Sequence, residues 1–421
     1  MKTETPYREL LLRLFRAGVE RVSASRALPA YLPRSRPQGA SLVLGAGKAA
    51  AAMAAVAAQR LTGPVSGLVV TRYGHTSPVP LDAIEVIEAA HPVPDQKSRQ
   101  AARQMLALAR GAGPQDRLVF LASGGGSAVL CLPVPGLAFA EKQAVVRHFI
   151  LSGAPISEIN CVRKHLSAIK GGRLAAASGT SDIRTYIISD VPGDDPAAVA
   201  SGPTVADPST LAAARAVIAR YGSPCQDKVM ALLGDRAHET PKPGTLNERH
   251  VIIAKAADCL DAAAALARAE GWQVHNLGDH IEGEARILGA EHAKLARALK
   301  GRGGRWLMLS GGEATVTVRH PEGGGGPNLE YLAGLAQELN GEAGIYALAG
   351  DTDGIDGSED NAGAIITPTT RRRAQAAGLD IKACLAQNQT YALFKTLDDL
   401  VVTGPTLTNV NDLRAIVIDG G

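Results

Sequence analysis

Five times in this chain, a short apolar run ends in a turn rich in glycine, serine or aspartate. The clearest case joins the apolar residues 345–348 to the turn Gly350-Asp351-Thr352-Asp353-Gly354. An apolar run of this length, followed by glycine, is typical of a buried strand that ends in a tight turn. In open α/β sheets, ligands bind outside the carboxyl ends of the strands. The pattern therefore predicts an α/β protein whose five turns converge on one cleft.

The composition narrows the class of protein. A length of 421 residues is enough for two or three domains, and a formal charge of +3 gives no electrostatic footprint for nucleic acid. The five cysteines are scattered and never form a C-x-x-C pair, which argues against a zinc site and favours a reducing compartment. No segment is typical of a signal peptide or a membrane helix. We expect a cytoplasmic protein that binds neither nucleic acid nor a membrane.

The first turn carries a weak dinucleotide fingerprint, G-x-G-x-x-A, formed by Gly45, Gly47 and Ala50. The acidic residue that would bind a ribose after the next strand is absent, and only Arg72 keeps an NADP-binding interpretation open. Lys48 opens a helix beside free backbone N–H groups, a position that suits an anionic ligand. The alternative is a glycine turn for close packing, with a solvated Lys48.

The second turn reads Ser123-Gly124-Gly125-Gly126-Ser127. Successive glycines expose N–H groups that can form an anion-binding nest, and the two serines add hydroxyls. A flexible surface loop is the alternative, but it is less consistent with the apolar strand that precedes the turn.

A basic stretch follows, in which Arg163, Lys164, Ser167 and Lys170 would share one helical face. Such a face suits a small acidic substrate, whereas an exposed basic helix without function is the alternative.

The third turn contains Asp190, Asp194 and Asp195 at the end of a predicted strand. Carboxylates at such a place suit Mg²⁺ binding or general-base catalysis, although Asp195 could instead cap a helix. The polar stretch 234–247, rich in proline and glycine, predicts a hinge or domain boundary.

The remaining turns lie in the C-terminal part of the chain. Gly311, Gly312 and Glu313 follow an apolar strand, and Asn328 lies at the opening of an amphipathic helix. All four are candidates for contacts with substrate or phosphate.

Taken together, these motifs resemble the bacterial and archaeal D-glycerate 2-kinase family, whose C-terminal part is the MOFRL domain. The resemblance extends over nearly the whole chain, and its carriers are Gly45-Ala46-Gly47-Lys48, Ser123-Gly124-Gly125-Gly126-Ser127, Val162-Arg163-Lys164-His165, Ser189-Asp190-Val191-Pro192-Gly193-Asp194-Asp195, Ser310-Gly311-Gly312-Glu313 and Gly350-Asp351-Thr352-Asp353-Gly354. Each motif alone is weak, but six in the same order are specific.

The resemblance implies two α/β domains with the active site in the cleft between them. A Rossmann-like three-layer domain would occupy residues 1–240 and a smaller MOFRL-type domain residues 241–421, and the last segment could return to the N-terminal domain. The implied activity is ATP- and Mg²⁺-dependent phosphorylation of D-glycerate at O2, which gives 2-phosphoglycerate and ADP. A homodimer is compatible with this expectation.

The implied chemistry assigns a role to each candidate. Lys48 would supply a cation for the bound or transferring oxygens, and Asp190 or Asp351 would accept the proton of the glycerate hydroxyl. Asp194 or Asp353 would hold Mg²⁺. The glycine turns would bind phosphate, and the basic stretch would bind the carboxylate.

The sequence departs from the family at one loop, which commonly reads Gly-Arg-Asn-Gln-Glu. Here the loop reads Gly326-Pro327-Asn328-Leu329-Glu330, so a positive charge and an amide are lost. Proline suits the first turn of a helix, and we therefore expect the fold of this loop to survive.

Two other functions compete with the kinase. Some family members are labelled hydroxypyruvate reductases, which would need NAD(P)H, but the missing ribose-binding carboxylate counts against this activity. A non-catalytic sugar-phosphate-binding protein would explain the serine- and glycine-rich nest. The many carboxylates disfavour it, because they would repel a phosphate without a metal.

Overall fold

The computed structural model describes residues 4–77, 79–320 and 322–421. Contacts divide the chain into two units. Residues 24–253 form the N-terminal unit, whereas residues 254–421 form the C-terminal unit together with the described residues up to Ser23.

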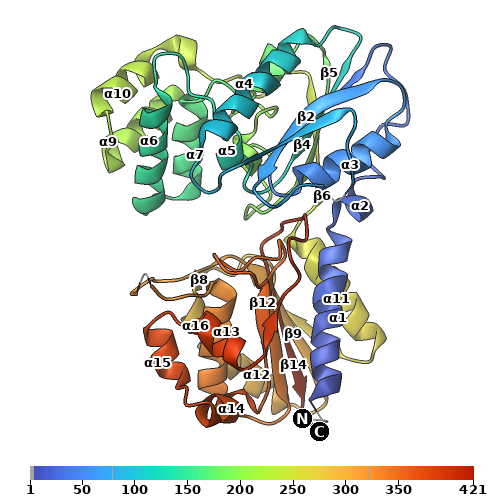
Figure 1. Ribbon diagram of the computed structural model, residues 1–421, viewed down its shortest axis with the longest axis vertical. Coiled ribbons are helices and arrows are strands. Elements are labelled where there is room, and N and C mark those ends of the chain that lie inside the picture. The colour runs from blue at the N-terminus through green and yellow to red at the C-terminus, as the bar shows by residue number, and fades with distance from the viewer. Residues whose placement is uncertain (1–3, 78, 321) are drawn as a thin grey trace. The chain divides into compact units, whose positions relative to one another are not determined.

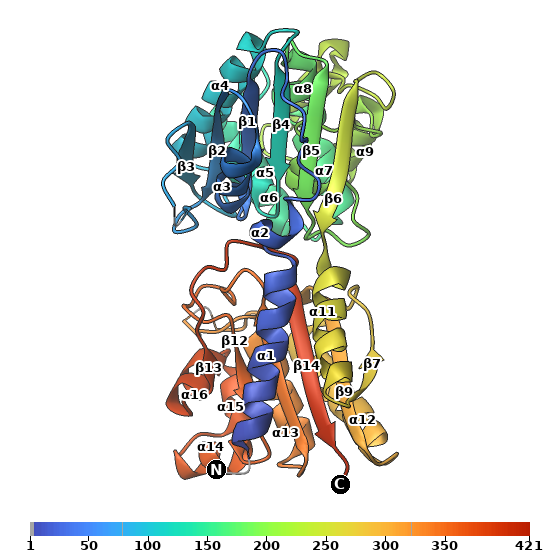
Figure 2. The ribbon, with the colours of Figure 1, turned by 90° about the vertical axis from the view of Figure 1, so that its right-hand side faces the viewer.

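The N-terminal unit is built on a six-stranded sheet with the order β3-β2-β1-β4-β5-β6 (Figure 2). Its strands are β1 (Ser41–Ala46), β2 (Val65–Arg72), β3 (Ile84–Ala89), β4 (Arg117–Ala122), β5 (Asp182–Ile188) and β6 (Glu248–Ala254). Every pair of neighbours from β3 to β5 is parallel. This strand order is the one found in Rossmann folds, and it confirms the Rossmann-like α/β class.

Helices cover both faces of this sheet. In Figure 1, α3 lies on one side, and α4 and α5 lie on the other. A separate group made of α6, α7, α9 and α10 packs around its own apolar core. The helices of this unit are α2 (Ala24–Ala27), α3 (Ala50–Arg60), α4 (Gln96–Gly111), α5 (Gly126–Val129), α6 (Phe139–Leu151), α7 (Ile156–His165), α8 (Arg173–Ala177), η1 (Val199–Ser201), α9 (Leu211–Tyr221), α10 (Gln226–Gly234) and η2 (Arg236–His238).

The C-terminal unit contains a mixed sheet with the order β13-β12-β11-β14-β9-β7 and a small two-stranded sheet, β10-β8. In the larger sheet, only the β7–β9 pair is parallel. The strands are β7 (Gln273–Asn276), β8 (Gly283–Glu284), β9 (Arg305–Gly312), β10 (Ala314–Thr315), β11 (Ile345–Asp351), β12 (Gly363–Ile366), β13 (Leu400–Val401) and β14 (Asp412–Asp419).

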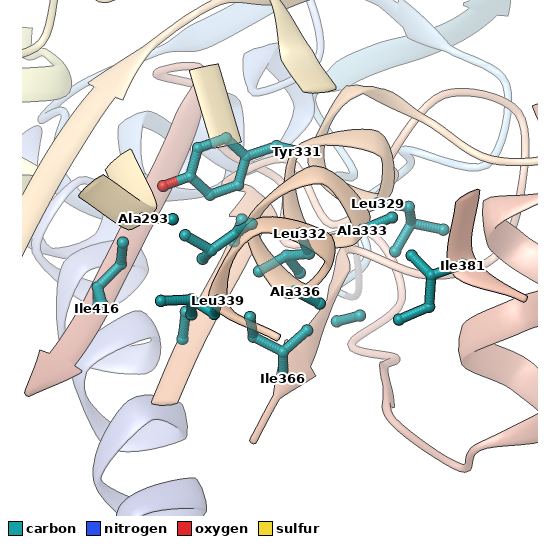
Figure 3. Close-up of a cluster of buried hydrophobic side chains, with 14 of the residues drawn as sticks. Ala293, Leu329, Tyr331, Leu332, Ala333, Ala336, Leu339, Ile366, Ile381 and Ile416 are labelled. Atoms are coloured by element: carbon teal, nitrogen blue, oxygen red, sulfur yellow. The ribbon is translucent and has the colours of Figure 1, made fainter. Parts of the chain in front are cut away.

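The main apolar core of this unit lies between the mixed sheet and the helices around α13. Figure 3 shows Leu332, Ala336 and Leu339 of α13 packed toward Ile366 of β12. The helices of the unit are α1 (Thr5–Arg21), α11 (Ala256–Ala269), α12 (Ala285–Lys300), α13 (Pro327–Leu339), α14 (Thr370–Ala376), α15 (Ile381–Ala386) and α16 (Thr390–Thr396). Among the described residues, no helix combines the length and apolar character needed to cross a membrane.

The first helix belongs to the C-terminal unit, beside α11 (Figure 1). Tyr7 stacks on Tyr346 with ring centroids 4.2 Å apart, and Arg8 forms a 2.7 Å ion pair with Asp399. The last strand, β14, lies in the interior of the same sheet. The N-terminal segment up to Ser23 therefore belongs to the C-terminal unit. The last segment stays in that unit and does not return to the N-terminal domain, which corrects the expectation from the sequence.

The expected boundary at 234–247 also differs from the division in the structure. This stretch is held within the N-terminal unit, because Thr240 Oγ1 donates to Asp207 Oδ2 over 3.0 Å and Asp207 N–H donates to Pro241 O over 2.8 Å. The stretch is therefore a connection held against the rest of the N-terminal unit, and not a hinge. The division between the units falls after Ile253.

Candidate active site

The first two glycine turns lie at the carboxyl ends of adjacent parallel strands, and backbone N–H groups of the first donate hydrogen bonds to the second. Lys48 N–H donates to Gly124 O over 2.8 Å, and Ala49 N–H donates to Ser123 Oγ over 2.9 Å. Gly47 has a φ of +129°, and a Cβ there would lie 2.3 Å from Ser123 O. Only glycine permits this approach. The two hydrogen bonds and this close approach therefore hold the first turn, which carries Lys48, against the second turn.

Two side chains lie against the middle of the triple-glycine turn. Gly125 has a φ of +77°, and a Cβ there would meet His91 Cδ2 at 3.2 Å and Lys48 Cγ at 3.4 Å. A Cβ at Gly126 would lie only 2.5 Å from Ala200 Cβ. The turn is thus a closely packed element, which argues against the flexible surface loop considered above.

The second turn ends in a polar network that the sequence did not reveal. Ser127 Oγ lies 2.7 Å from Ser201 Oγ, and Ser201 Oγ donates to Asn160 Oδ1 over 3.1 Å. Lys170 Nζ donates to Ser127 O over 2.8 Å. Lys170 therefore lies at the end of the glycine turn, where its side chain contacts the candidate anion-binding nest Ser123–Ser127.

The basic stretch is not one helical face, because α7 ends at His165 and Lys170 lies beyond it. Lys164 forms a buried 3.2 Å ion pair with Asp207. Burial alone would raise the pKa of Asp207, but the charge of Lys164 and hydrogen bonds from Ser209 leave this pKa below its usual value. Lys164 is therefore neutralised within the protein. Arg163 is half-buried, and none of the described residues accepts a hydrogen bond from its guanidinium.

The aspartates after β5 occupy a tight turn. Asp190 and Asp194 are half-buried, and Asp194 has a φ of +54°. Asp195 Oδ1 accepts the N–H of Ala197 over 3.0 Å. Asp195 thus stabilises the local turn, in line with the capping role considered as its alternative.

The carboxylates after β11 also bind backbone N–H groups. Asp351 Oδ1 accepts the N–H of Asp353 over 2.9 Å, and Asp353 Oδ1 accepts the N–H of Ile355 over 2.8 Å. These consecutive bonds fix both side chains at the end of the strand. No group of three or more His, Cys, Asp or Glu side chains that could hold a metal occurs among the described residues.

The opening of α13 is capped by a carboxylate from the fifth turn. Asp356 accepts the N–H of Asn328 at Oδ1 and the N–H of Leu329 at Oδ2, both over 3.0 Å. Asn328 Nδ2 also donates to Asp412 Oδ1 over 2.7 Å. Pro327 occupies the first turn of α13, as the sequence predicts. The two N–H groups that follow it, which could have bound phosphate, are used inside the protein.

A buried charge network continues from this cap. Burial raises the pKa of Asp356 to about 7, and the charge of Asp412 adds to this effect. Asp412 Oδ2 accepts from Arg414 over 2.5 Å, and Arg414 also donates to the carbonyls of Gly311 and Gly312 over 3.1 and 3.2 Å. Asp412 and Arg414 lie in an ordinary strand pattern, which carries no signal of a buried charge network.

The fourth turn is engaged in the same network. Gly311 N–H donates to Gly278 O over 2.9 Å, and Gly312 pairs with Asp412 in the β9–β14 ladder. The side chain of Glu313 is exposed. The two glycines thus contribute first to the sheet, and their phosphate contacts stay a prediction.

Comparisons with known proteins agree with the motifs. Residues 10–234 match the family described as "Domain of unknown function (DUF4147)", and residues 306–412 match the MOFRL family. The chain is 49% identical over 417 residues to a "Putative hydroxypyruvate reductase" of Agrobacterium vitis, covering 98% of this chain and 94% of that protein.

Relatives named as kinases are also similar. A D-glycerate 2-kinase of Thermotoga maritima is 36% identical over 412 residues, covering 96% of this chain and 97% of that protein. The crystal structure of a glycerate kinase from Thermotoga maritima superposes with a TM-score of 0.87 at 34% identity, covering 98% of this chain and all of that one. The resemblance is confirmed, and the chain belongs to the glycerate kinase family that combines the DUF4147 and MOFRL domains.

Proposed function

We propose that this protein is a D-glycerate 2-kinase, which uses ATP and Mg²⁺ to phosphorylate glycerate at O2. The observation that carries the proposal is the attachment of Lys48 to the triple-glycine turn through the 2.8 Å bond to Gly124. This arrangement holds the lysine side chain beside a turn in which three successive residues lack side chains.

Phosphoryl transfer depends on positioning and on charge neutralisation rather than on covalent catalysis. The hydroxyls of Ser123 and Ser127 already bond to Ala49 N–H and Ser201 Oγ, so the backbone N–H groups of Gly124 and Gly125 are the main candidates for contact with phosphate oxygens. Lys48 offers a positive charge beside them. A preorganised cation of this kind stabilises charge that develops in the transition state. His91, which lies against Gly125, is a further candidate for contact with the substrate.

The carboxylates supply the remaining roles. Asp190 or Asp351 accepts the proton of the glycerate hydroxyl, and Asp194 or Asp353 provides an oxygen ligand for Mg²⁺. Magnesium is usually held by one or two carboxylates, with water and substrate phosphates as its other ligands. The fixed Asp351 and Asp353 side chains fit this kind of site, in which bound Mg²⁺ would neutralise the phosphate charge.

An NAD(P)H-dependent hydroxypyruvate reductase is the second candidate. The Rossmann strand order and the name of the Agrobacterium vitis relative favour it. The residues that end β2, Thr71 and Arg72, include no carboxylate for a ribose. Glu88 of the neighbouring strand accepts the N–H of Gly74 over 2.6 Å, so this carboxylate serves the turn after β2.

A two-part assay separates these functions. The purified protein is incubated with D-glycerate, ATP and Mg²⁺, and ADP release is followed by a coupled reaction. In parallel, NADH and NADPH oxidation is followed with hydroxypyruvate. The proposal predicts ADP release that requires both glycerate and Mg²⁺. Oxidation of the reduced cofactor without any ADP release would establish the reductase instead.

A further inference from the structure

The charges of three basic side chains act on the buried thiol of Cys131 in the N-terminal unit. Lys142 of α6 donates from Nζ to Arg163 O over 3.2 Å, and Lys170 donates from Nζ to Ser127 O over 2.8 Å. The side chains of Lys142 and Lys170 are almost fully buried, at 1% exposure each. Lys142, Arg163 and Lys170 are called the cation cluster below. Lys142 was not among the candidates found from the sequence.

Ion pairing separates the cation cluster from its neighbour Lys164. Among the described residues, no carboxylate forms an ion pair with any of its three members, whereas the neighbouring Lys164 is paired with Asp207. Isolated buried charges are costly, and proteins usually pair them or leave them neutral. A cluster of three cations without a carboxylate is therefore poorly explained by stability alone.

The charged groups that act on Lys142 and Lys170 are all basic, with the Cys131 thiol as the one exception. Burial lowers the pKa of Lys142 to about 8, and the charges of Arg163 and Arg173 lower it further, whereas Cys131 opposes the shift. Burial lowers the pKa of Lys170 to about 7, and Lys142 and Arg163 act in the same direction. Burial raises the pKa of the Cys131 thiol, so this group supplies no stable negative charge.

We infer that the cation cluster binds a small oxyanion at the Ser127 end of the glycine turn, and that this oxyanion is the substrate carboxylate. Lys170 links the cluster to the turn, because it donates directly to Ser127 O. The half-buried guanidinium of Arg163 has the planar donor geometry that suits a carboxylate. The identity of the ligand as glycerate rests on the proposed function, whereas the binding of an anion does not.

A bound anion would change the protonation of the cluster. An opposite charge nearby favours the charged form of a lysine and raises its pKa. At about pH 8, where Lys170 is mostly neutral and Lys142 is partly neutral, anion binding should therefore draw protons from solution. Affinity should decline as the pH rises above this range.

The test is calorimetric binding to the full chain at about pH 8, in two buffers with different heats of ionisation. The probes are D-glycerate, inorganic phosphate and ATP. The variants are Lys170→Met and Arg163→Gln, and the second changes a half-buried side chain that folding tolerates more easily. Arg147→Gln removes an exposed cation from α6, the helix that carries Lys142, and is the matched control.

We expect proton uptake with D-glycerate in the wild type and in Arg147→Gln. Arg163→Gln and Lys170→Met should each weaken glycerate binding by about tenfold or more, equivalent to 1.4 kcal/mol. Lys170→Met should also reduce the proton uptake, which a merely structural lysine would not do. ATP binding should be little changed.

Three other results are informative. Loss of ATP or phosphate binding with intact glycerate binding would overturn the carboxylate assignment and give the cluster to a phosphate. Unchanged binding of all three probes in folded variants would overturn the anion site. Glycerate binding that depends on the cluster, together with no kinase activity, would support the site and reject the proposed function.

Discussion

Lys48 donates its backbone N–H to the carbonyl of Gly124 over 2.8 Å, so two turns 76 residues apart in the chain act as one element. This bond uses only the backbone of Lys48, and the Lys48 side chain lies against Gly125 of the triple-glycine turn. This separation of backbone and side-chain roles allows the function of Lys48 to be tested independently of folding.

Lys48→Ala should reduce the turnover of the proposed kinase by about 10²–10³-fold, the usual effect of removing one preorganised charge contact. The melting temperature should stay near that of the wild type, because the Lys48 N–H bond is retained. Lys97→Ala, at an exposed position on α4, is the control. Near-normal turnover of a folded Lys48→Ala protein would reject the role of this lysine.

Gly125→Ala should impair both stability and turnover. Alanine at a φ of +77° costs about 1–2 kcal/mol. The added Cβ would also press on His91 and Lys48, which should move them from their positions over the turn. Gly153 has a φ of +69° with nothing within 4 Å of a Cβ, so Gly153→Ala has the same backbone cost outside the site. If Gly125→Ala and Gly153→Ala lost turnover equally, the packing of His91 and Lys48 against Gly125 would not contribute to catalysis.

Asp351→Asn and Asp353→Asn should each raise the Mg²⁺ concentration needed for half-maximal turnover or abolish turnover. An amide retains the oxygen that accepts a backbone N–H, but it lacks the charge that attracts the ion. Asp380→Asn, at the N-cap of α15, changes a carboxylate that also accepts backbone N–H groups and is the matched control. Wild-type Mg²⁺ titration curves for both variants would leave these aspartates with a structural role only.

Asp356 should make stability depend on pH. Its pKa of about 7 in the folded protein lies above the unfolded value of about 4. The folded state therefore binds more protons between these values, and the free energy of unfolding falls as the pH rises through this window. Asp356→Asn should remove this component of the slope, while loss of one of the two oxygens that cap α13 costs about 1 kcal/mol. Denaturant unfolding at several pH values measures both effects, and an identical slope in the variant would contradict the assignment.

Pro327→Arg restores the residue common in the family. The capping bonds of Asp356 to Asn328 and Leu329 do not involve position 327, so the variant should fold normally. We expect the KM values for ATP and glycerate to be unchanged or higher, because another cation compensates for the missing arginine, and Arg319, whose charge acts on Glu330 of α13, is the candidate in the same unit. A tenfold gain in kcat/KM, about 1.4 kcal/mol, would show that the position was functionally vacant.

The parts of the structure that depend on neighbouring residues could be predicted from the sequence. Apolar runs followed by glycine predicted where β1, β4 and β11 end, because a strand and the turn after it are both encoded within about ten neighbouring residues. Pro327 likewise indicated the start of α13, since proline is favoured in the first turn of a helix.

The parts that depend on contacts distant in sequence could not be predicted. Asp356 caps a helix that begins 29 residues earlier in the chain, and Asp207 neutralises Lys164 from another segment. An amphipathic helix such as residues 5–21 fits any apolar face, so its place in the C-terminal unit was not encoded locally. The cation cluster was missed in part because Lys142 lies in an ordinary helical pattern.

The identity of the phosphorylated product tests the central claim most directly. The protein is incubated with D-glycerate, ATP and Mg²⁺, and the products are examined by ³¹P NMR spectroscopy. We predict that 2-phosphoglycerate forms together with ADP. Exclusive formation of 3-phosphoglycerate would contradict the position of transfer, and the absence of any phosphoglycerate, with NADH-dependent reduction of hydroxypyruvate, would contradict the kinase itself.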